Sequence, residues 1–169
     1  MPNHLRCFLS VLFACSSAGI ADAQSTYTIS PDQPDAIQVF IDEFVQDGDV
    51  IQLAAGTYVL PGTIATRGKA ITLRGVLDKA GEPASVLDGA GTHRVLICQS
   101  GETSATVFEN LVIRNGAATG SSPANRGGGM YNEDSSSPTL INCAFTSNSA
   151  SDGGGMFNLP SWRRCGKRK

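Results

Sequence analysis

The clearest periodic pattern in the chain is an amphipathic stripe in PDAIQVFIDEFVQDGD, residues 34–49. Its apolar residues come in adjacent pairs four positions apart, which places them on one face of a helix. These residues are Ala36, Ile37, Phe40, Ile41, Phe44 and Val45. Pro34 suits a first helical turn and Gly48 suits a helix end. The pattern predicts a helix over residues 34–46.

The rest of the chain alternates short apolar, β-branched runs with glycine and small polar residues. Each run is too short for a helix, and the glycines between them would destabilise one. The expected strands lie within 24–30, 50–53, 57–60, 71–73, 86–87, 95–98, 106–108, 111–113, 130–131, 139–141, 143–145 and 156–157. Many short strands with frequent turns are typical of a sandwich, a barrel or a repeat architecture.

A repeated hexapeptide favours the repeat architecture. GGGMYN at 127–132 returns as GGGMFN at 153–158, a period of 26 residues. Such periods are typical of repeat proteins, in which equivalent residues of adjacent units stack. We therefore predict that Met130 pairs with Met156 and that their neighbours pair in the same register. The structural repeat residues are Gly127, Gly128, Gly129, Met130, Tyr131, Asn132, Phe145, Asn148, Gly153, Gly154, Gly155, Met156, Phe157 and Asn158.

A weaker internal similarity relates ENLVIRNG, residues 109–116, to INCAFTSNS, residues 141–149. In this alignment Asn110 matches Asn142, and Asn115 matches Asn148 after a slip of one residue. Asparagine tolerates turn conformations and can hydrogen-bond to its equivalent one unit away. We expect four to five repeat units in all.

The helix, GDVIQLAAGTYVL (48–60), KAITLRG (69–75), ENLVIRNG and the GGGM repeat together resemble the right-handed parallel β-helix, or pectin-lyase-like, superfamily. The resemblance covers residues 26–158. Two GGGM copies around the FxxN sequence 145–148 resemble more closely the repeats of chlamydial polymorphic outer-membrane proteins, with glycine in place of the usual alanine. The resemblance implies an all-β solenoid with an N-terminal capping helix and no C-terminal cap.

Charge narrows the classes of partner. The chain has 13 basic and 15 acidic side chains, but five basic residues lie in its last seven positions. Residues 24–162 hold 7 basic and 14 acidic side chains, a charge of −7. An acidic body without basic and aromatic patches argues against nucleic acid as a partner.

The first 23 residues have the pattern of an export signal peptide. An apolar run follows Arg6, and residues 21–23 have the small-x-small form that signal peptidase cuts. The run is too short to span a bilayer, so we expect no transmembrane span in the mature chain. Residues 12–15 also resemble a lipobox, which would anchor the protein through a lipid on Cys15. Either pattern predicts export, to the extracellular space or the bacterial outer-membrane surface.

No catalytic motif is visible. His93 has no partner at a catalytic spacing, and the acid pairs at 42–43, 47 and 49, and 133–134 are typical of solvated turns and caps. The cysteines Cys98 and Cys143 lie in apolar runs without zinc or redox spacing, so we expect buried thiols. We therefore predict no catalytic, cofactor-binding or metal-binding residue.

Two functions remain open. The first is an exported, non-enzymatic repeat protein with an adhesin-like or structural role, whose partner is cell-surface polysaccharide or a host or neighbour surface protein. The second, implied by the resemblance, is a polysaccharide lyase or glycoside hydrolase. Calcium is expected only under this alternative, together with an arginine base. The available arginines are Arg74, Arg94, Arg114 and Arg126.

These observations divide the chain into a signal peptide (1–23), a repeat domain (24–158) and a basic tail (159–169). The best-defined repeat unit spans 127–158. After the second hexapeptide the repeat pattern stops, and the tail follows as LPSWRRCGKRK. This predicts either a basic arm for an anionic surface or a chain shortened by a frameshift or stop.

Overall fold

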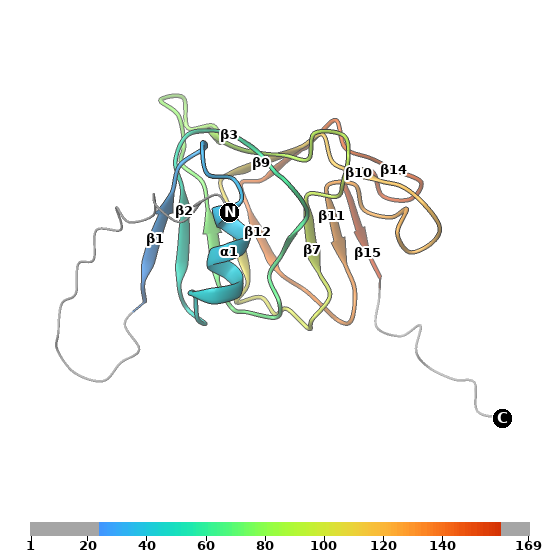
Figure 1. Cartoon of the computed structure of the whole chain (residues 1–169), viewed down its shortest axis with the longest axis horizontal. Coiled ribbons are helices and arrows are strands. Elements are labelled where there is room, and N and C mark those ends of the chain that lie inside the picture. The colour runs from blue at the N-terminus through green and yellow to red at the C-terminus, as the bar shows by residue number, and fades with distance from the viewer. Residues whose placement is uncertain (1–23, 160–169) are drawn as a thin grey trace, which may run out of the picture.

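The computed structural model describes residues 24–159, which form one helix and fifteen strands (Figure 1). All pairings between these strands are parallel, and they divide the strands among four sheets. The first sheet has the order β1 (Thr26–Ile29), β2 (Val50–Leu53), β5 (Thr72–Arg74), β8 (Val107–Glu109) and β12 (Thr139–Ile141). The second sheet has the order β13 (Ala144–Thr146), β9 (Leu111–Arg114), β6 (Ser85–Asp88) and β3 (Gly56–Val59).

The third sheet has the order β15 (Met156–Asn158), β11 (Met130–Asn132), β7 (Leu96–Cys98) and β4 (Ile64–Ala65). Its strands β7, β11 and β15 run side by side in Figure 1. A two-stranded sheet joins β10 (Ala117–Ala118) and β14 (Ser149–Ala150). From β2 onward, successive strands along the chain belong to different sheets, so each sheet pairs segments that are distant in sequence.

Single asparagines turn the chain from the first sheet to the second. Asn110 separates β8 from β9 and has a φ of 55°, and Asn142 between β12 and β13 has a φ of 48°. Asparagine tolerates this left-handed conformation because its short side chain can hydrogen-bond locally. The Asn142 Nδ2 donates to the Asn110 Oδ1 at 3.0 Å. The predicted match of these two residues is therefore confirmed.

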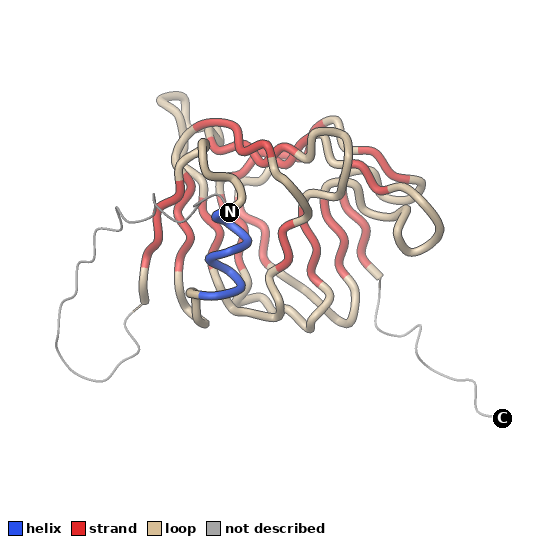
Figure 2. The backbone as a smooth tube through the Cα atoms, viewed as in Figure 1, coloured by secondary structure: helices blue, strands red, loops and turns tan. Residues whose placement is uncertain are grey.

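The helix α1 (Ala36–Glu43) is shorter than the predicted 34–46 and buries only part of the predicted stripe, since Phe44 is 57% exposed. Ala36, Ile37 and Ile41 are its buried side chains, and they belong to one core with residues of all three large sheets. Figure 2 shows the helix lying against the strands. Burial of one such aliphatic side chain contributes about 1.5–3 kcal/mol, so α1 is an integral part of the core.

Two polar side chains fix α1 to its neighbours. The Gln38 amide pairs with the backbone of Ala65 in β4, accepting from its N–H at 2.8 Å and donating to its carbonyl at 3.2 Å. Lys69 Nζ donates to the carbonyls of Ile41 and Val45, the latter at 2.9 Å. A cation at a helix C-terminus satisfies free carbonyls and complements the helix dipole.

The prediction of an all-β right-handed parallel β-helix solenoid with four to five coils, a capping helix and a missing C-terminal cap is wrong. The described residues form four separate parallel sheets and one helix, an α/β-type arrangement. The sequence interpretation took the 26-residue repeat as one coil of two or three short strands and the helix as a cap on the first coil. In the structure the strands are distributed over separate sheets, and α1 contributes side chains to their shared core.

Two predictions fall outside the described residues. The export signal at 1–23, with the alternative lipid site at Cys15, precedes them, and the basic tail follows them from residue 160. Nothing in the described part of the chain supports a signal peptide or an outer-membrane assignment. Within residues 24–159, no helix is both long and apolar enough to cross a membrane.

Candidate functional site

A groove of about 460 Å³ lies where the strands of the second sheet end. Its lining residues are Val59, Asp88, Ala90, Gly91, Asn115, Gly116, Ser147 and Ser149. The strand register brings them together, because Val59 pairs with Asp88, Asp88 with Arg114, and Arg114 with Thr146. Since neighbouring strands lie about 4.8 Å apart, the groove crosses four consecutive strand levels.

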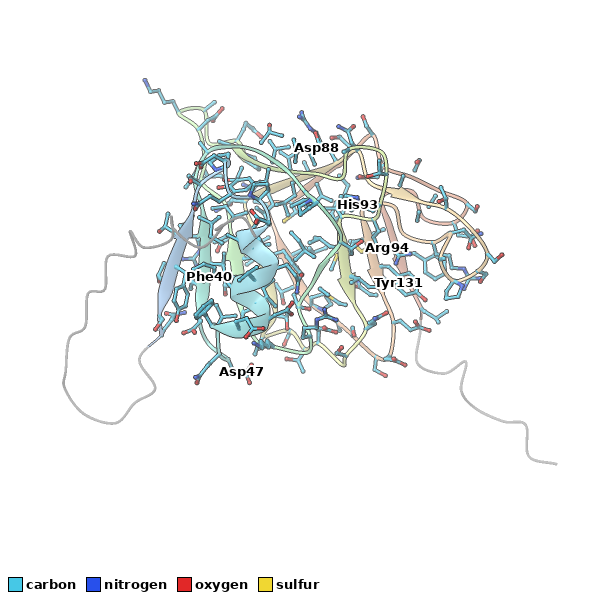
Figure 3. The ribbon with its side chains drawn as sticks, in the orientation of Figure 1. Phe40, Asp47, Asp88, His93, Arg94 and Tyr131 are labelled. Carbon is cyan, nitrogen blue, oxygen red and sulfur yellow. The ribbon has the colours of Figure 1, made fainter. Side chains whose placement is uncertain are left out.

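Asp88 is the carboxylate of this groove, and its oxygens are fully engaged (Figure 3). Oδ1 accepts from the Ala90 N–H at 2.9 Å and from Asn115 Nδ2 at 3.1 Å. Oδ2 accepts from Asn115 Nδ2 at 3.0 Å and from Arg114 Nε at 2.9 Å. Burial would raise the pKa of Asp88, but the bonds from Ala90, Asn115 and Arg114 outweigh it, so the pKa is lowered. Asp88 is thus an ionised, structural carboxylate.

Other polar groups in the groove remain available to a ligand. Within the described part of the chain, Asn115 Oδ1 and the hydroxyls of Ser147 and Ser149 have no hydrogen-bond partner. Both serines are exposed. Gly91 adds no side chain to the lining, and a Cβ there would meet nothing within 4 Å, so this part of the groove is open. The groove can therefore exchange several hydrogen bonds with a polar ligand.

A column of aromatic rings and guanidinium groups lies on the third sheet. The rings of Tyr131 and Phe157 stack with centroids 5.8 Å apart and an angle of 9° between their planes. Arg94 lies 4.7 Å from the Tyr131 centroid (Figure 3), and Arg126 lies 4.9 Å from that of Phe157. Such contacts contribute about 0.5–2 kcal/mol each. Arg94 also donates to backbone carbonyls of residues 124–127, so its guanidinium attaches this loop to the third sheet.

Tyr131 is only 2% exposed beneath this loop. Burial, and then the neighbouring Glu133, raise its pKa. The hydroxyl has no hydrogen-bond partner of normal geometry among the described residues. A buried hydroxyl without a partner carries a desolvation cost, which the stacking of its ring offsets.

The repeated GGGM strands pair as predicted. Met130 lies opposite Met156, and the next two residues of each strand follow in register. Asn132 Nδ2 donates to Asn158 Oδ1 at 2.7 Å. The glycines permit this close stacking, since a Cβ on Gly129 would lie 2.4 Å from the Gly155 carbonyl oxygen.

The FxxN segment has a structural role as well. Asn148 Oδ1 accepts from the Gly116 N–H at 2.8 Å, and its Nδ2 donates to the Ile113 carbonyl at 2.9 Å. Because Thr146 pairs with Arg114, Asn148 lies beside Gly116. The predicted match of Asn148 with Asn115 is therefore wrong by one position.

Sequence reasoning missed Glu102, a carboxylate that is 1% exposed. Oε1 accepts from Thr66 Oγ1 at 2.8 Å and the Gly68 N–H at 2.9 Å. Oε2 accepts from the Ser100 N–H at 2.9 Å and Ser136 Oγ at 2.7 Å. Burial would raise the pKa of Glu102, but these four bonds lower it. The available signal was one acid within QSGETS, between two strand-forming runs.

Three of the acids considered from sequence bind backbone N–H groups or form a surface ion pair. Asp49 accepts from the N–H groups of Ser25 and Gln46, and Asp47 accepts from that of Ala70. Asp42, exposed on α1, pairs with an arginine at 3.2 Å. None of these carboxylates lies beside Asp88 in the groove. The N–H contacts of Asp47 and Asp49 are typical of acidic residues in turns.

The arginines and His93 are also dispersed. Arg74 pairs with Glu109 at 2.7 Å on the first sheet, whereas Arg126 pairs with Asp152 at 3.2 Å beside the third sheet. His93 Nδ1 shares a hydrogen bond with the hydroxyl of its neighbour Thr92 at 2.8 Å. In residues 24–159, no group of three or more His, Cys, Asp or Glu side chains is placed to hold a metal ion.

The two described cysteines are buried or half-buried thiols, as predicted. Burial raises the pKa of Cys98 to about 12 and also raises that of Cys143. Thiolate nucleophiles require the opposite shift, so neither residue is suited to thiol chemistry.

The chain was compared with known proteins. No family model matches it, and no curated protein matches it. The resemblance to pectin-lyase-like β-helices and to polymorphic outer-membrane repeats is therefore unsupported, and the four-sheet arrangement contradicts it.

Proposed function

We propose that this chain is an exported, non-enzymatic protein that binds a cell-surface polymer through the groove at Asp88. The observation that supports it is the state of that carboxylate. All its acceptor positions are used within the chain, whereas Asn115 Oδ1, Ser147 and Ser149 are available to a ligand. The arrangement favours binding over bond cleavage.

Sugar cleavage needs different groups. Glycoside hydrolases usually combine an acid and a base or nucleophile from two carboxylates across the bond. Asp88 is the one carboxylate among the lining residues of this groove, and its lowered pKa makes it a poor general acid. A polysaccharide-active enzyme is therefore the less favoured alternative.

The proposal is tested by whether polysaccharide retains the protein without being cleaved by it. The purified full chain is incubated with insoluble bacterial cell-envelope polysaccharide, and both the bound fraction and released sugars are measured. We expect saturable retention, with no increase in reducing ends or unsaturated products. Catalytic release of sugars, or no retention above that of an unrelated acidic protein, would contradict the proposal.

A further inference from the structure

The charge of the groove restricts the ligand that it can bind. Asp88 is the one charged residue among those that line the groove, and Arg114 Nε lies 2.9 Å from its Oδ2, so the two charges form a neutral pair. An anionic polymer would gain little from a guanidinium already paired with a carboxylate, and the −7 body would repel it. An uncharged polymer does not need a free guanidinium and is not repelled by the acidic body of the protein.

The available polar groups suit hydroxyls. A serine hydroxyl donates and accepts, and an amide oxygen accepts, so Ser147, Ser149 and Asn115 Oδ1 can each bond to a sugar hydroxyl. Val59, whose residue is 56% exposed, supplies an apolar patch at the other end for the C–H face of a sugar ring. The groove lacks the Trp and Tyr anchors that dominate protein–protein interfaces.

The groove also has a direction. Its residues come from consecutive strand levels of β3, β6, β9 and β13, and successive levels are about 4.8 Å apart. A ligand that fills it must extend along this stacking direction across several strand levels. An extended polysaccharide strand has this shape.

We propose that the groove binds one extended strand of uncharged polysaccharide, lying across the four strand levels from Val59 to Ser149. This inference rests on the proposed binding function and names its ligand class. Contacts through a few hydroxyls and one aliphatic side chain predict weak affinity for a short oligomer, with a Kd of roughly 0.1–5 mM. Useful attachment then requires a polymer that engages many copies of the protein.

The experiment titrates the full chain with two neutral glucose hexasaccharides, one β-1,4-linked and one α-1,4-linked, and with a hexamer of galacturonic acid. Binding is followed by NMR or calorimetry. We expect at least one neutral hexamer to bind, and the acidic hexamer to bind at least tenfold more weakly. Equal or tighter binding of the acidic hexamer, or no binding of either neutral one at 10 mM (roughly −2.7 kcal/mol), would overturn the inference.

Three variants locate the site. Ser149→Tyr places a ring in the groove and should weaken binding at least tenfold, while Ser151→Tyr, on an exposed position outside the lining, should leave it within twofold. The double variant S147A/S149A removes both hydroxyls without adding volume and should weaken binding about fivefold. It tests the same site even if the tyrosine variant misfolds. Equal binding by all three variants would place the ligand elsewhere.

The two proposals fail differently. If envelope material retains the chain, S149Y abolishes retention and neutral hexamers do not compete, the binding function stands and the ligand class is wrong. If the chain is not retained at all, or releases sugars, the binding function itself is wrong.

Discussion

Replacement of Glu102 by glutamine tests whether one buried carboxylate stabilises the packing of three turns. Its four donors come from segments near residues 66–68, 100 and 136. Glutamine has nearly the same shape, but its NH2 group cannot accept from the Ser100 N–H. Hydrogen bonds to charged groups contribute about 1.5–3 kcal/mol, and an unpaired buried donor costs about 1–3 kcal/mol. We expect a net loss of about 2–4 kcal/mol.

The measurement is urea and thermal unfolding of wild type and E102Q at neutral pH. For a domain of this size the loss corresponds to a decrease of roughly 8–16 °C in Tm. Glu82→Gln is the matched control, because Glu82 is exposed and its substitution should change stability by less than about 0.5 kcal/mol. A Glu102→Gln variant as stable as this control would refute the reasoning.

The pH dependence gives a second readout. The folded pKa of Glu102 lies below its ordinary value of 4.5, so its contribution is fully present above that pH. The contribution disappears as the pH falls through the lowered folded pKa, because Glu102 is then protonated in both the folded and the unfolded state. The stability difference between wild type and E102Q should therefore shrink in acid. A difference of the same size at pH 7 and at acidic pH would contradict the assignment.

Three other substitutions test the packing. Tyr58→Phe should lower the free energy of unfolding by about 1–2 kcal/mol, because the buried hydroxyl donates to two carbonyls at 2.7 and 3.1 Å. In the wild type, ultraviolet titration should show this tyrosine ionising only near its raised pKa of about 12. Gly129→Ala should cost more than about 3 kcal/mol because of the contact with Gly155, whereas Gly62→Ala, which meets nothing within 4 Å, should be close to neutral by the same assay. Lys69→Met should lower stability by about 1 kcal/mol and increase amide exchange in the last turn of α1.

Local pattern predicted the elements and their pairing better than the architecture. The GGGM repeat predicts the Met130–Met156 register because identical strands pair best with each other in parallel. The Asn110–Asn142 contact follows from two asparagines at equivalent turns. The fold class did not follow, since the repeat indicates which strands pair but not how many separate sheets they form or that α1 joins their core.

The groove and Glu102 were beyond sequence reasoning for a different reason. Val59 and Ser149 are ninety positions apart, and no spacing rule connects them. Glu102 lies in a turn where acids are usually solvated, and its burial depends on donors from distant turns. A single sequence gives no signal for contacts of this kind.

The unequal spacing of the paired strands has an evolutionary consequence. In the third sheet, Leu96 precedes its partner Met130 by 34 residues, yet Met130 precedes Met156 by only 26. The register is the same in both pairs, so the loops alone absorb the difference in length. Insertions and deletions in such loops are tolerated far better than changes in strands. The long loop between β10 and β11, which carries most of this difference, can therefore change length, while the two-residue turns at the groove and the strand pairing that supports them stay constant.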